Sequence, residues 1–272
     1  MSKHTLRSFS PLLLCTALSA GCASFAVPGR PADLSIFTKE GQLDPVREVD
    51  ERPVESLGIG DLLARQPMAA FPTSMAVVRI QAPGYGADST TQTAGSGPFT
   101  VVTSRTPEEE TAFAELAELP MLSGVAPVNR LLVPEQLSGD LELREIAARL
   151  HADVLLVYTL DTSSRTAEPS PEQVLIGLLT LGGYLRQDTD LECTASALLL
   201  DTRTGYLYGT AEASARRSKE HSCHGAEARV ERERRRLERA ALAELASELG
   251  GTWQGVVATY APATPGAPRG TE

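Results

Sequence analysis

Two hydrophobic periods alternate along residues 71–258, and they predict strands interleaved with helices. Residues 74–80 and 99–103 are predicted strands because apolar and β-branched side chains dominate both segments. Residues 121–128 predict a shorter strand, at an edge or a bend because it contains a proline. Residues 154–160 are apolar without interruption, which is typical of a central strand covered on both faces.

A β-hairpin is predicted further along the chain. Residues 191–200 and 206–215 have the composition of strands, and the five residues Asp-Thr-Arg-Thr-Gly separate them. Gly205 closes this turn, where a left-handed backbone conformation is expected and glycine adopts it without steric cost.

Three segments carry the signature of helices. A threonine, a proline and a glutamate within residues 106–109 form a helix start with a capping box. Residues 141–150 place their apolar side chains on one face of a helix. Residues 226–249 predict a long charged helix with a narrow apolar stripe, and Gly250 is expected to end it.

Together these elements predict an α/β (α+β) fold. A mixed β-sheet is packed by helices, and a β-hairpin is followed by a long C-terminal helix. The fold occupies a single domain over residues 71–258, and residues 259–272 have the composition of a disordered tail.

The start of the chain has the composition of a secretory signal. Lys3 and Arg7 precede the apolar residues 11–20, a stretch too short to span a bilayer as a helix. Small residues then lead into Cys22, and Leu18–Cys22 resembles the bacterial lipobox, whose cysteine carries the lipids. An ordinary signal peptide cut near Ala20 and an uncleaved anchor are the alternatives. Residues 1–21 are thus expected to be a signal peptide and 22–70 a lipidated, mostly flexible tether.

The residue after the cysteine is Ala23, and by resemblance to lipoprotein sorting it favours the outer membrane. The net charge of −10 excludes nucleic acid as a partner class and disfavours anionic membrane surfaces. Attachment to the membrane is therefore expected through acyl chains at Cys22.

Two cysteines, Cys193 and Cys223, lie beyond the predicted lipid site. In an oxidising periplasm such a pair predicts a disulfide, and two separate buried thiols are the alternative. His221, Cys223 and His224 are residue types that zinc binds, but they crowd at one turn without a second ligand pair. No metal site is predicted.

Residues 174–181 are apolar on all sides and follow a capping box at 170–173. A helix of eleven residues, 171–181, would be about 16 Å long, which is too short to cross a bilayer. Three interpretations stay open: a buried helix, a surface that contacts a partner or membrane, and half of a transmembrane β-hairpin. Where the helix is exposed, Leu175, Leu178 and Leu181 are candidate partner-binding residues.

Catalytic motifs are scarce in this sequence. Three histidines follow Cys22, and no nucleophile elbow, phosphate loop or zinc-protease motif is found. Asp153 and Asp161 flank the central strand and are interpreted as capping and turn residues. The arginines of residues 229–239 alternate with glutamates, which predicts a solvated helix face with i,i+4 ion pairs. The sequence therefore predicts a protein that is not an enzyme and holds no cofactor.

The order of elements from residue 74 onward resembles a superfamily of envelope lipoproteins. It includes the curli secretion channel subunit and the outer-membrane activators of penicillin-binding proteins, and the sheet resembles the amino-terminal domain of TolB. The residues that carry this resemblance are Met75–Val78, Ala147–Leu156 and Ala197–Gly205. The rhombotarget lipoproteins share the same order. The resemblance implies the same fold and a role in scaffolding, activation or secretion.

These observations predict a lipoprotein anchored at Cys22 on the periplasmic side of the outer membrane. It would act there as a non-catalytic binding or adaptor module for an envelope protein. The alternative is a subunit of an oligomeric export or envelope-assembly complex, in which the chain would contact further copies of itself.

Overall fold

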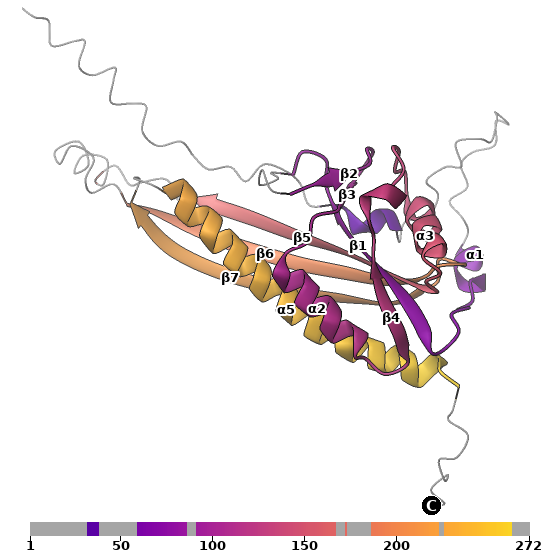
Figure 1. Ribbon diagram of the computed structural model, residues 1–272. Coiled ribbons are helices and arrows are strands. Elements are labelled where there is room, and N and C mark those ends of the chain that lie inside the picture. The colour runs from indigo at the N-terminus through magenta and orange to yellow at the C-terminus, as the bar shows by residue number, and fades with distance from the viewer. Residues whose placement is uncertain are drawn as a thin grey trace, which may run out of the picture.

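The computed structural model describes residues 32–37, 59–85, 91–166, 172, 186–222 and 226–262. Seven strands form one mixed sheet in the order β2-β3-β1-β5-β6-β7, and β4 also pairs with β1 (Figure 1). The strands are β1 (Thr73–Gln81), β2 (Thr93–Ala94), β3 (Thr100–Val102), β4 (Leu122–Pro127), β5 (Val154–Thr166), β6 (Arg186–Asp201) and β7 (Leu207–Ser222). The helices are η2 (Leu34–Phe37), α1 (Ile59–Ala64), α2 (Pro107–Ala117), η3 (Arg130–Leu132), α3 (Asp140–Arg149) and α5 (Ala226–Tyr260).

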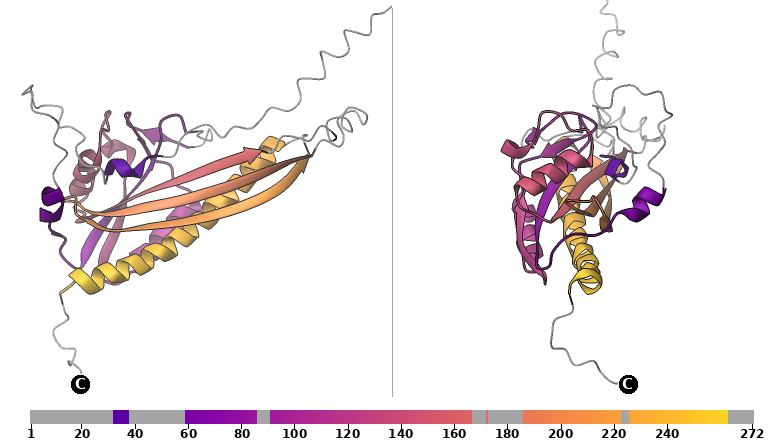
Figure 2. Two further views of the ribbon diagram at one scale, coloured as in Figure 1. Left: turned by 180° about the vertical axis from the view of Figure 1, so that it is seen from behind. Right: turned by 90° about the vertical axis from the view of Figure 1, so that its right-hand side faces the viewer.

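The sheet carries a hydrophobic core on each face. Helices α2 and α5 lie side by side over one face, and α3 covers the other (Figures 1 and 2). Because consecutive residues of a strand point to opposite faces, Leu156 packs under α5 while Leu155 packs under α3. This confirms the predicted α+β fold and explains why residues 154–160 are buried at every position.

The predicted hairpin is confirmed and is longer than expected. Strands β6 and β7 have 16 residues each and pair antiparallel from Leu200 and Leu207 to Arg186 and Ser222. Gly205 has φ +68°, the left-handed conformation that the turn requires. The far ends of β5, β6 and β7 and the start of α5 form an arm that extends from the body of the domain (Figure 2).

Helix α5 does not end at Gly250, as the sequence predicted, but continues to Tyr260. A glycine inside a helix costs about 1 kcal/mol relative to alanine. Trp253 and Val256 lie beyond the glycines and are only 1% and 4% exposed, so their burial offsets that cost. None of the helices in the described residues is long and apolar enough to cross a membrane.

Two segments within residues 22–70, the predicted tether, contact the folded domain. Phe37 is 8% exposed, and its ring centroid lies 5.4 Å from that of Phe99, so Ala32 and Phe37 belong to the core on the α3 face of the sheet. Residues 65–69 are held at the hairpin turn, where the Met68 N–H donates to Asp201 Oδ2 at 2.6 Å. Both segments are short, and only the surfaces that they meet in the fold explain why they are ordered.

Candidate functional site

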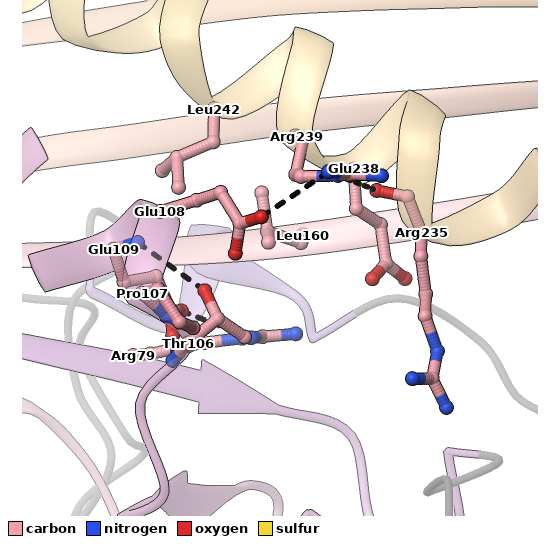
Figure 3. Close-up of a pocket in the computed structure, with 10 residues that line it drawn as sticks. All are labelled: Arg79, Thr106, Pro107, Glu108, Glu109, Leu160, Arg235, Glu238, Arg239 and Leu242. Atoms are coloured by element: carbon pink, nitrogen blue, oxygen red, sulfur yellow. Dashed lines mark hydrogen bonds and ion pairs between the residues drawn. The ribbon is translucent and has the colours of Figure 1, made fainter. Parts of the chain in front are cut away.

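A cleft of about 340 Å³ opens between the start of α2 and the middle of α5. Figure 3 shows its two sides, with Leu160 of β5 between them. We call it the α2–α5 cleft, and its lining residues are Arg79, Thr106, Pro107, Glu108, Glu109, Leu160, Arg235, Glu238, Arg239 and Leu242. Three arginines and three glutamates thus surround an apolar floor.

The carboxylate of Glu109 is the centre of the α2 side of the cleft. The predicted capping box is confirmed: the Glu109 N–H donates to Thr106 Oγ1 at 3.2 Å, and the Thr106 N–H donates to Glu109 Oε2 at 2.8 Å. The same carboxylate also accepts from Arg79 Nη1 at 3.0 Å and from the Tyr158 hydroxyl at 2.8 Å. Glu109 is 1% exposed, so a buried charge is held by one cation and two neutral donors.

Burial raises the pKa of Tyr158 well above its usual value, and the charge on Glu109 raises it further. Burial alone would lower the pKa of Arg79, but the negative charges around it, Glu109 first among them, and the hydrogen bond to Glu109 together outweigh burial and raise it. Tyr158 therefore stays a hydrogen-bond donor and Arg79 stays charged throughout the physiological pH range.

Arg79 contributes one donor that nothing in the described residues accepts. Its Nε is buried and has no hydrogen-bond partner, and the side chain is 14% exposed. A buried donor without an acceptor costs about 1–3 kcal/mol, so a bound acceptor at this position would be favourable.

The α5 side of the cleft is a chain of ion pairs. Arg234 binds Glu231 at 2.8 Å and Glu238 at 2.7 Å, and Arg235 binds Glu231 at 2.9 Å. The predicted i,i+4 pairs along residues 229–239 are therefore present on the described part of this helix. Sequence spacing did not predict that Arg239 reaches across to Glu108 of α2, at 3.3 Å.

Arg79 and Tyr158 were not among the residues that the sequence singled out. Arg79 is the one charged residue within the apolar run of β1, and that interruption is the signal that could have identified it. Tyr158 carries no comparable signal, because a tyrosine inside a buried strand is most often a packing residue.

The sequence-predicted site residues lie elsewhere. Cys22, Leu175, Leu178, Leu181, Cys223 and His224 are outside the described residues. Asp153 forms an ion pair with Arg203 at 3.1 Å beside the hairpin turn, as expected of a turn residue. Asp161 is on β5, and burial raises the pKa of its carboxyl group.

The predicted Cys193–Cys223 disulfide stays a prediction, because Cys223 lies outside the described residues. Cys193 lies on β6 and pairs with Ala215 of β7. Its side chain is buried, and burial raises the pKa of the thiol to about 11.

The sequence matches no protein-family model. It matches no curated protein. Among solved structures, it is similar to a minor lipoprotein from Acinetobacter baumannii, with a TM-score of 0.30 and 13% identity over 72% of this chain and 99% of that one. For lipoprotein GNA1162 from Neisseria meningitidis the TM-score is 0.28 and the identity 15%, over 54% of this chain and 85% of that one. For a PelC dodecamer from Paraburkholderia phytofirmans the TM-score is 0.25 and the identity 10%, over 68% of this chain and 92% of that one.

Proposed function

We propose that the chain is a membrane-anchored envelope lipoprotein whose domain binds a protein partner in the α2–α5 cleft and catalyses no reaction. The observation that carries this proposal is the set of charges lining the cleft. Glu108, Glu109 and Glu238 each bind an arginine, so none is available as a general base.

The cleft fits a partner segment that presents a carboxylate. The orphaned Nε of Arg79 offers a buried donor at the inner end, and Arg235 and Arg239 are about half exposed. Leu160 and Leu242 supply apolar contact beside these cations, the combination of apolar floor and charged rim that is usual in protein recognition.

Reversing one charge of the rim tests this binding site. Arg239→Glu is expected to abolish capture of the envelope partner, because it places a carboxylate where the incoming carboxylate must bind. Cross-linking in intact cells, followed by identification of the linked protein, measures capture.

Arg236→Glu is the matched control. Arg236 is on the same helix, is similarly exposed and also forms one ion pair, with Glu233 at 3.1 Å, but it does not line the cleft. Equal losses in both variants, or no loss in either, would contradict the proposed site. A hydrolytic or transferase activity that disappears in the Glu109→Gln variant would contradict the absence of catalysis.

The anchor is the lipid proposed at Cys22. Cys22→Ser is expected to leave the protein unlipidated and to move it from the membrane fraction to the soluble fraction, because no acyl chain then holds it. Incorporation of labelled palmitate and flotation with outer membranes are the measurements. Flotation of the variant together with absence of label in the wild type would contradict the anchor.

A further inference from the structure

Among the described residues, no strand pairs with the outer edge of β7. Strand β7 pairs with β6 on one side only, and it is the last strand in the order of the sheet within the described residues (Figure 2). A row of unpaired N–H and C=O groups on such an edge is a template for another strand. Proteins usually protect long edges with proline, bulges or charges.

The middle of β7 has little of that protection. The strand has no proline, and its bulge lies near the start, between the partners of Leu199 and Leu200. Residues 210–215, Thr-Ala-Glu-Ala-Ser-Ala, hold one charge and only small neighbours, so a second backbone can approach closely. Arginines and a lysine begin only at Arg216.

We propose that two copies of this chain pair antiparallel through β7, centred on Ser214, to form one continuous sheet across a two-fold axis. Glu212, Ser214 and Arg216 are exposed on the face away from α5, whereas Ala211 and Ala213 are buried on the other face. A two-fold axis perpendicular to the sheet places the α5 faces of both copies on the same side of the joined sheet. Two residues directly opposite each other across the β7–β7 pair must therefore come from the same face.

Charge complementarity selects the register. With Ser214 opposite itself, Glu212 stands opposite Arg216 twice, once on each side of the axis, and Ala213 stands opposite Ala215. Shifting the centre to Glu212 or to Arg216 places like charges opposite each other, and shifting it to Ala213 or Ala215 loses both ion pairs. Opposite charges across a strand pair stabilise it, and like charges destabilise it.

The same symmetry suits the anchor of the proposed function. Ala32 packs on the face away from α5, and the axis leaves both copies of Ala32 on one side of the joined sheet. Ala32 follows Cys22 by ten residues, a reach of about 35 Å, so both lipids can enter one membrane. The proposed dimer depends on pairing of the β7 edges and does not require lipidation.

Cysteine cross-linking of the full-length protein tests the register. In a Cys223→Ser background, Ser214→Cys is expected to give a disulfide-linked dimer on a non-reducing gel, because each Ser214 meets its own copy. Thr210→Cys alone is the control and is expected to give no disulfide-linked dimer on the gel, since Thr210 stands opposite Ser218. Combining Thr210→Cys with Ser218→Cys is expected to restore the dimer.

Charge reversal supplies the second measurement. Glu212→Arg is expected to raise the dimer dissociation constant about tenfold, and adding Arg216→Glu is expected to restore it, as light scattering in detergent would report. A monomer by light scattering would overturn the proposal. So would equal cross-linking of Ser214→Cys and Thr210→Cys, which would indicate random collision or another register.

Discussion

Replacing Asp201 by alanine is expected to destabilise the domain by about 4 kcal/mol, because four hydrogen bonds to a buried charge disappear together. The carboxylate of Asp201 is fully buried. Its Oδ2 accepts from the Met68 N–H at 2.6 Å and from the Tyr208 hydroxyl at 2.9 Å. Its Oδ1 accepts from the N–H groups of Arg203 and Thr204 at 2.9 and 3.0 Å. One side chain thus shapes the hairpin turn and fastens residues 65–69 to it.

Asp153→Ala is the matched control for this change. Asp153 lies beside the same turn but is partly exposed, and its carboxylate binds Arg203, whose side chain is 62% exposed. A loss of about 0–1 kcal/mol is expected there. Urea unfolding followed by circular dichroism measures both variants, and similar losses in the two would contradict the role of Asp201.

Acid should weaken the contribution of Asp201. Burial alone would raise the pKa of its carboxyl group, but the hydrogen bonds from Met68, Thr204, Tyr208 and Arg203 outweigh burial and lower it. A lowered pKa means that the stabilisation is present above about pH 4 and is lost as the pH falls through the folded-state value. The stability difference between wild type and Asp201→Asn is therefore expected to shrink below about pH 4.

Removing Glu109 is expected to cost about 3–5 kcal/mol, because the change leaves the guanidinium of Arg79 buried without its counter-charge. The hydroxyl of Tyr158 and the N–H of Thr106 lose their acceptor at the same time. Thermal and urea unfolding of Glu109→Ala measure the loss. Glu108→Ala is the control, since Glu108 is 40% exposed and its ion pair with Arg239, at 3.3 Å, lies at the surface.

The double variant Arg79→Met with Glu109→Gln separates charge from packing. Removing both buried charges together is expected to recover part of the stability that Glu109→Ala loses. The loss in free energy of unfolding is compared with the sum of the losses in Arg79→Met and Glu109→Gln. A larger loss in the double variant would show that the unpaired charge of Arg79 is not the reason for the effect of Glu109→Ala.

Local patterns predicted most of the elements correctly. The capping box at Thr106 and Glu109, the hairpin turn at Gly205 and the strand at residues 154–160 all follow from interactions between near neighbours. The same local patterns predicted an end of α5 eleven residues too early, because the gain that carries the helix past Gly250 comes from burying Trp253 against other elements.

The candidate site could be predicted only in part. The capping role of Glu109 is written in four consecutive residues, but its bonds to Arg79 and Tyr158 join residues 30 and 49 positions away.

The sequence by itself determined the α+β class, the helix starts and the hairpin, since hydrophobic period and turn chemistry act within a few residues. Tertiary structure alone decided that Phe37 and Met68 join the folded domain, that α2 and α5 enclose a charged cleft, and that β7 keeps an open edge. Each of these depends on surfaces contributed by segments distant along the chain, and the energy of burying them does not exist until the sheet brings those segments together.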